Sequence, residues 1–186
     1  MEADAHKVAM DAAIEAEGRA FDALLEGRDA APLLRVAEAS WRRSWETAPP
    51  RSYGRLIGMV KAAVLAGDAA EAAAYVRDAV GEPDSPPSAY ALAITLLVEG
   101  DDAGAARAAA GMRGGSDAFD RTAEAIDALA TGHAERYANA LAAIVADFEQ
   151  RTEHLTGVAI ADTALMLERL AEPRGMAARP ESDVLP

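Results

Sequence analysis

The stretch 96–110, LLVEGDDAGAARAAA, contains the end of one helix, a turn and the start of the next helix. Apolar residues run up to Glu99, then Gly100 and Asp101 follow, and Ala105 comes five residues after the glycine. Glycine readily takes the left-handed conformation that ends helices, and aspartate is a good residue for capping the next helix. The stretch therefore predicts a helical hairpin with a tight turn.

The same pattern occurs twice more, at 64–76 (VLAGDAAEAAAYV) and at 128–141 (ALATGHAERYANAL). The turn glycines Gly67, Gly100 and Gly132 are 33 and 32 residues apart. Helical hairpins that repeat every ~34 residues are typical of tetratricopeptide arrays. The spacing therefore predicts consecutive hairpins, arranged either as a tetratricopeptide-like array or as an up-and-down helical bundle.

The composition favours an all-α fold. Alanine, the residue with the best helix propensity, is abundant, whereas aromatic residues make up only 5% of the 186 residues. Strands favour aromatic and β-branched residues, which are sparse here. Together with the apolar spacing of 3.6 residues, this composition predicts about eight or nine helices.

Two details of the helix boundaries follow from capping chemistry and apolar patterning. Asp68 and Glu71 have the spacing of a capping box, which predicts that Asp68 caps a helix. An apolar helix is expected over about 157–171, and because it is apolar on most sides it should be among the more buried helices. We expect a single helical domain over 1–173 and a C-terminal tail over 174–186.

The charge and the cysteine content exclude several classes of protein. The net charge is −13, which argues against a nucleic-acid-binding protein, because such a protein needs a basic face. There is no cysteine, so disulfides, cysteine metal sites and cysteine nucleophiles are excluded. The acidic N-terminal residues lack the pattern of a signal peptide, and no apolar run could span a membrane. We therefore expect a cytoplasmic protein that contacts neither nucleic acid nor membrane.

No set of residues has the spacing of a catalytic or metal site. The histidines His6, His133 and His154 do not form pairs four residues apart, as a helical zinc site would require. Glu149 and Glu153 are four residues apart on an expected helix face, but such carboxylates usually lie on a solvated face. No glycine-rich phosphate loop and no serine nucleophile motif occur. The sequence predicts a non-catalytic protein without a metal or cofactor.

The segment 40–46, SWRRSWE, places both tryptophans of the chain on one helix face, beside Arg42 and Arg43. Tryptophans are common in protein interfaces, and they are also common in cores. With only two tryptophans available to fill the interior, we expect Trp41 and Trp45 to belong to the core and keep the interface as the alternative.

Acidic residues form two stripes on expected helices. The stripe on the first helix consists of Asp11, Glu15 and Asp22, with Asp4 and Glu26 at its ends. The stripe over 117–130 consists of Asp117, Asp120, Glu124 and Asp127. Carboxylates three or four residues apart on a helix repel one another. The stripes are either solvated faces or a docking surface for a basic partner protein, and as a docking surface their residues would contact that partner.

The C-terminal stretch 154–186, HLTGVAIADTALMLERLAEPRGMAARPESDVLP, resembles the end of an all-α family, number forty-nine among the immunity proteins of bacterial polymorphic-toxin systems. The residues that carry the resemblance are Leu167, Leu170, Ala171, Gly175, Ser182, Asp183, Leu185 and Pro186. Such proteins bind and neutralise a cognate toxin that is encoded beside them. The resemblance implies a toxin as the partner, and it implies no catalytic residue.

Three functions follow from these observations. The first is a non-catalytic cytoplasmic module that binds another, basic protein, with an immunity protein that neutralises a toxin as its specific form. The second is a tetratricopeptide-like adaptor or regulatory protein. The third is an all-α enzyme or small-ligand binder whose pocket between helices has no motif in the sequence. The sequence leaves the oligomeric state open.

Overall fold

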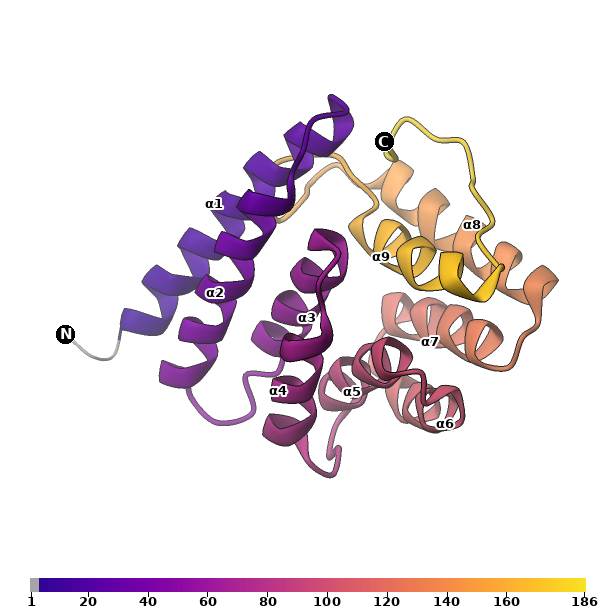
Figure 1. The fold of residues 1–186 in the computed structure, drawn as a ribbon, viewed down its shortest axis with the longest axis horizontal. Coiled ribbons are helices and arrows are strands. Elements are labelled where there is room, and N and C mark those ends of the chain that lie inside the picture. The colour runs from indigo at the N-terminus through magenta and orange to yellow at the C-terminus, as the bar shows by residue number, and fades with distance from the viewer. Residues whose placement is uncertain (1–3) are drawn as a thin grey trace.

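Helices make up all the regular secondary structure of residues 4–186, the part of the chain that the computed structural model describes (Figure 1). The α-helices are α1 (Ala5–Leu25), α2 (Ala31–Thr47), α3 (Gly54–Ala66), α4 (Ala70–Val80), α5 (Pro86–Glu99), α6 (Asp102–Met112), α7 (Asp117–Ala130), α8 (Ala134–Gln150) and α9 (Asp162–Ala171). A short 3-10 turn, η2 (Glu172–Arg174), follows α9. Nine helices and no strand within residues 4–186 confirm the predicted all-α fold class.

The three turns predicted from glycine are present. Gly67 and Gly100 directly follow α3 and α5 with φ of 85° and 79°, and Gly132 follows α7 with φ of 74°. In this left-handed region a residue with a Cβ is strained, so glycine is the favoured residue. The turns reverse the chain, so α3 with α4, α5 with α6, and α7 with α8 are the three predicted hairpins.

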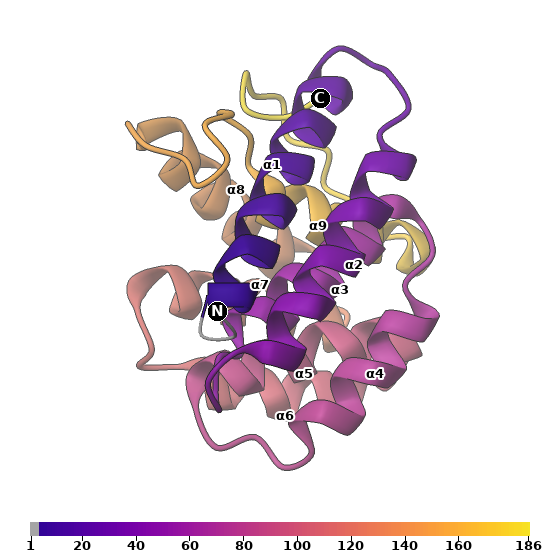
Figure 2. The same cartoon turned by 90° about the vertical axis from the view of Figure 1, so that its left-hand side faces the viewer.

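The helices pack in consecutive pairs. Each helix from α1 to α8 contacts the next one in the chain, and α3 also contacts α5, as α5 contacts α7. The α3–α5 and α5–α7 contacts join the first helices of successive hairpins. In Figure 1, α1 and α2 lie side by side at one end of the molecule, while α7 and α8 lie at the other end, and Figure 2 shows the molecule from the side of α1 and α2.

Helix α9 closes the arrangement. It contacts α3, α7 and α8, and in Figure 1 it lies between α3 and α8. Four of its side chains, those of Ala164, Met166, Leu167 and Ala171, have no exposed surface. The prediction of a well-buried C-terminal helix is confirmed for these residues, whereas Leu165 is only half-buried. The last helix thus joins the centre of the chain to its C-terminal hairpin.

Two predicted helix boundaries are wrong. Helix α4 begins at Ala70 without a side-chain cap, because the Asp68 N–H bonds back to the carbonyl of Ala63 and so belongs to the end of α3. Helix α9 begins at Asp162 and not near 157, because the Ala161 N–H donates to the carbonyl of Val184 in the C-terminal segment. Both errors have the same cause. In each case a backbone N–H near the predicted helix start donates to a carbonyl outside that helix, and local capping rules do not consider such partners.

The segment 174–186, predicted to be a tail, is packed against the domain. The Glu168 carboxylate of α9 accepts hydrogen bonds from the N–H groups of Ala178 and Arg179, at 3.0 and 2.6 Å. The side chain of Val184 is buried as well. These contacts make the segment part of the same packed unit as α9.

Helices α2 and α3 approach closely at one glycine. A Cβ on Gly58 would lie 2.6 Å from the ring of Trp41. Trp41 is buried, and its indole N–H donates to the Glu17 carboxylate at 2.8 Å. Packing and this hydrogen bond together fix the position of the ring. Trp45 is half-buried and stacks on Tyr53, with ring centroids 5.7 Å apart. The expectation of a core position is confirmed for Trp41 and holds in part for Trp45.

The close approach at Gly58 generates a stability prediction. Gly58→Ala should lower the free energy of unfolding by roughly 1–3 kcal/mol, because overpacking against the fixed Trp41 ring outweighs the gain in helix propensity of ~1 kcal/mol. Gly54→Ala in the same helix is the control, because a Cβ there would meet no atom within 4 Å. Urea unfolding followed by far-UV circular dichroism measures both variants. Equal stability of the two variants would contradict the tight α2–α3 contact.

Candidate functional site

The acidic stripe of α1 lies on the surface. Asp11, Glu15 and Asp22 are exposed, and none of them forms an ion pair with another residue of the part that the structure describes. At the ends of the stripe, Asp4 pairs with Lys7 and Glu26 pairs with Arg28. The central three carboxylates therefore have no counter-charge within residues 4–186.

The acidic stripe of α7 has a different environment. Glu124 pairs with Arg113 at 2.9 Å and with Arg136 at 2.7 Å, and Asp127 also pairs with Arg136, at 2.9 Å. Hydrogen bonds from both arginines lower the pKa of the Glu124 carboxyl. Because Arg113 follows α6 and Arg136 belongs to α8, these carboxylates join α7 to the helices on both sides.

The other two acidic residues at the start of α7 differ from each other. Asp120 accepts a hydrogen bond from the Gly114 N–H at 2.8 Å and so holds the turn between α6 and α7. Asp117, in the first turn of α7, is exposed. Within the predicted stripe on α7, three of the four carboxylates therefore make contacts inside the protein.

Charge reversal should affect the free energy of unfolding differently in the two stripes. Replacing Asp120, Glu124 and Asp127 together by lysine should lower the free energy of unfolding by roughly 1–3 kcal/mol, because ion pairs of this exposure contribute up to about 1 kcal/mol each and reversal adds repulsion. Replacing Asp11, Glu15 and Asp22 by lysine should leave it unchanged or raise it, because the net negative charge falls. Thermal unfolding at low and high salt measures both. An unstable α1 variant beside an unchanged α7 variant would contradict these assignments.

A groove runs between α1 and α2 next to the α1 stripe. It has a volume of about 510 Å³, and the α1 side supplies the small apolar residues Ala5, Ala9 and Ala12 together with Val8. Val8 is 67% exposed, which is unusual for an aliphatic side chain in this molecule. Polar residues from α2 form the opposite edge. The acidic stripe thus borders an apolar groove on the same helix.

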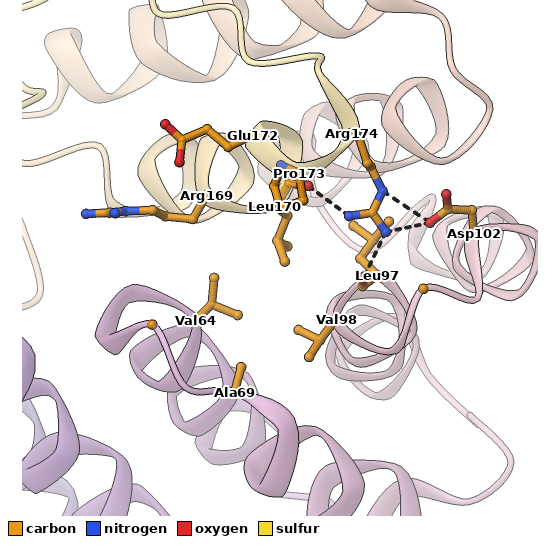
Figure 3. Close-up of a pocket in the computed structure, with 12 residues that line it drawn as sticks. Val64, Ala69, Leu97, Val98, Asp102, Arg169, Leu170, Glu172, Pro173 and Arg174 are labelled. Carbon is orange, nitrogen blue, oxygen red and sulfur yellow. Dashed lines mark hydrogen bonds and ion pairs between the residues drawn. The ribbon is translucent and has the colours of Figure 1, made fainter.

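A second groove lies where the α3–α4 and α5–α6 turns face the end of α9. Figure 3 shows Val64, Val98 and Leu170 pointing into this space of about 580 Å³. Arg174 borders the space, but its guanidinium donates to Asp102 and to two backbone carbonyls. Since its donors are used inside the protein, Arg174 fixes η2 to the α5–α6 turn.

Polar side chains meet at the centre of the molecule, at the start of α9. The Lys61 ammonium of α3 pairs with Asp162 at 2.5 Å and donates to the Thr163 hydroxyl at 3.1 Å. Burial acts to lower the pKa of Lys61, whereas the facing Asp162 carboxylate acts to raise it. The net effect of the charges and hydrogen bonds around Lys61 is a pKa above its usual value. The hydroxyl of Tyr90, from α5, is buried close to the side chains of Thr122 and Thr163, but it makes no hydrogen bond of acceptable geometry in residues 4–186. The group therefore includes one unsatisfied hydroxyl.

A cavity of about 250 Å³ opens beside this polar group, between α7, α8 and the segment 151–161. Two arginines on its wall share one carboxylate, because Arg121 and Arg151 each donate to a different oxygen of Asp147, at 2.8 and 2.6 Å. Phe148 and Leu155 form apolar wall beside them. The cavity wall thus has both polar and apolar surface.

A smaller cavity of about 80 Å³ adjoins the cavity of about 250 Å³ and reaches Glu17 of α1. Glu17 is only 8% exposed, and this burial raises the pKa of its carboxyl to about 7, although the hydrogen bond from Trp41 and the charge of Lys61 act in the opposite direction. The segment 151–161 covers this part of α1, with the Thr156 carbonyl 3.1 Å from where a Cβ on Gly18 would lie. Glu17 is the buried carboxylate of the site.

Glu17 and Lys61 were not predicted as site residues, although the sequence contains a signal for each. Glu17 lies on the apolar face of α1, four residues from both Ala13 and Phe21. Lys61 is the single charged residue of α3 after Arg55. A lone charge on an apolar face indicates either a paired buried group or a site. Which of the two applies depends on partners far away in the chain, which the sequence does not identify.

The described residues 4–186 contain no cluster of three or more histidine, aspartate or glutamate side chains that could hold a metal ion. The predicted pairing of Glu149 with Glu153 on one helix face is wrong, because α8 ends at Gln150. Glu149 instead accepts a hydrogen bond from the Ser182 hydroxyl at 2.6 Å. Within the same residues, no helix is both long and apolar enough to cross a membrane.

The buried carboxyl of Glu17 predicts how stability changes with pH. Its pKa is about 7 in the folded chain and about 4.5 when exposed, so folding favours the protonated form. Stability due to this group is therefore present below about pH 4.5 and is lost as the pH rises to about 7. Glu17→Gln should remove this dependence and raise the free energy of unfolding at pH 8 by on the order of 3 kcal/mol.

Urea unfolding of wild type and Glu17→Gln at several pH values between 4.5 and 8 measures the difference. Glu15→Gln, on the exposed face of the same helix, is the matched control and should follow the wild type. A constant difference between wild type and Glu17→Gln across this range would show that the Glu17 carboxyl is not held in a protonated state by burial.

Comparison of this chain with models of protein families, with curated proteins and with solved structures finds no match.

Proposed function

We propose that this protein is a non-catalytic module that binds another, basic protein through the exposed face of α1. The observation that carries the proposal is the contrast between the two acidic stripes. Asp11, Glu15 and Asp22 have no ion-pair partner in residues 4–186, whereas three of the four carboxylates of the α7 stripe are used inside the protein. Of the predicted contact residues, those on α1 form the docking surface, and Asp117 is the one on α7 that stays open to solvent.

Two further features of the surface support this proposal. The net charge of −13 attracts basic partners over a distance of about 10 Å at 0.1 M salt. The groove beside the stripe, with the exposed Val8, offers apolar area for short-range contact. Charge across an interface mainly raises the association rate and fixes orientation, whereas apolar contact slows dissociation.

The resemblance of the C-terminal stretch supports a toxin as the basic partner, so we propose an immunity protein that acts in the cytoplasm. The alternative in the same class is a tetratricopeptide-like adaptor or regulatory protein, which the order of hairpins and the contacts between α3, α5 and α7 support. Two properties of the captured partner separate them. An immunity protein would suppress the toxicity of its partner on coexpression, whereas an adaptor would bind a partner that is not toxic.

The contact surface is tested by association kinetics with a partner captured from the native host. The variant with lysine at 11, 15 and 22 should associate about tenfold or more slowly than wild type at low salt, and the difference should shrink as salt rises. The matched control carries lysine at Glu82, Glu135 and Glu181, which are exposed residues on other parts of the surface. This control has the same net charge as the α1 variant. Equal rates for the two variants would show that total charge, and not the face of α1, guides the partner.

A further inference from the structure

We propose that the cavity between α7, α8 and the segment 151–161 binds a small monoanionic organic molecule, namely a carboxylate with an apolar body. This site is separate from the proposed α1 surface and does not depend on it. Its walls come from α3, α5, α7, α8 and the first turn of α9, so it lies where the array closes on itself.

The charge of the lining favours an anion. The ionisable groups on the cavity wall are three cations and two carboxylates, and these are Lys61, Arg121, Arg151, Asp147 and Asp162. Lys61 and Asp162 neutralise each other, whereas Asp147 is shared between two arginines and neutralises only one positive charge. The five charged side chains on the cavity wall therefore carry a net charge of one positive unit, in a chain whose net charge is strongly negative.

The hydrogen-bonding groups favour a carboxylate as the anionic head. Arg121 uses one nitrogen in its bond to Asp147, which leaves further N–H donors of its planar guanidinium. That fork matches the two oxygens of a carboxylate. The hydroxyl of Tyr90 is more than nine-tenths buried, borders the same cavity and makes no hydrogen bond of acceptable geometry in residues 4–186, although the side chains of Thr122 and Thr163 lie close to it. A ligand oxygen would satisfy it, and leaving such a group unsatisfied is costly.

The remaining wall favours an apolar body on the same ligand. Phe119, Ile144, Phe148 and Leu155 line the cavity. Leu155 is 74% exposed, and a ligand at the mouth of the cavity would cover it. The volume of about 250 Å³ lies below the ~300–1,000 Å³ of pockets for drug-sized molecules, so the ligand is a small one. A single surplus charge fits a monoanion better than inorganic phosphate, which is a mixture of monoanion and dianion at neutral pH.

Phenylacetate is the probe for this site, with acetate, inorganic phosphate and neutral phenylacetamide as comparisons. Phenylacetate should raise the melting temperature of the full chain and shift the amide resonances of α7 and α8 residues around the cavity in a saturable way. Acetate should bind more weakly because it lacks the apolar body. Phenylacetamide should bind more weakly because it lacks the charge. Phosphate should bind more weakly because it lacks the apolar body.

Variants then connect binding to the named groups. Arg121→Gln should weaken phenylacetate binding about tenfold or more, because a charge-assisted contact is lost. Tyr90→Phe, which keeps the ring and removes only the hydroxyl, should weaken binding about threefold or more while the melting temperature without ligand stays equal or rises. Arg28→Gln, on the exposed turn after α1, should bind as wild type does.

Three results would overturn the proposal. The first is the absence of saturable shifts with either carboxylate at millimolar concentration. The second is equal binding of phenylacetate and phenylacetamide, which would show that the surplus charge does not select the ligand. The third is unchanged binding in both Arg121→Gln and Tyr90→Phe when circular dichroism shows that the variants are folded.

Discussion

The ion pair between Lys61 of α3 and Asp162 of α9 is the contact on which the closed arrangement of helices depends. Hairpins that follow one another along a chain form an open array unless the last element returns to an earlier one. Here α9 returns to α3, and the pair joins residues 101 positions apart at the point where the two helices meet. Removing one partner would leave a charge in a poorly solvated place, which is far more costly than the loss of a surface pair.

Several other polar groups are arranged around this closure. Glu17 from α1, Tyr90 from α5 and Thr163 from α9 all lie near the pair, and the segment 151–161 covers them from the side of α1. An interior made of alanine and aliphatic residues alone would have excluded water from this region more cheaply. The chain instead keeps an acid, a cation and an unsatisfied hydroxyl beside a cavity. Buried polar groups of this kind belong either to a structural pairing or to a site.

The two acidic stripes show how the same local pattern takes two different roles. Both have carboxylates three, four or seven residues apart on one helix. On α7, the neighbouring helices bring Arg113 and Arg136 to Glu124, so that the carboxylate stabilises the hairpin stack. On α1, which lies at the end of the array, Asp11 and Glu15 face solvent. A helix at the end of an array has one neighbour fewer, and its outer face therefore remains exposed to solvent.

The sequence by itself determined the local properties of this protein: the all-α class, the three glycine turns, the core position of Trp41, and the exposed stripe on α1. These properties depend on neighbours within one or two helical turns, which are visible in the sequence. Tertiary structure alone decided the pairing of Lys61 with Asp162, the start of α9 at Asp162, the internal role of Glu124 and the cavity beside Tyr90. Each of these depends on which distant segment takes up a charge or a backbone N–H, and with no sheet register or motif to fix those pairings, only the packing of the helices selects them.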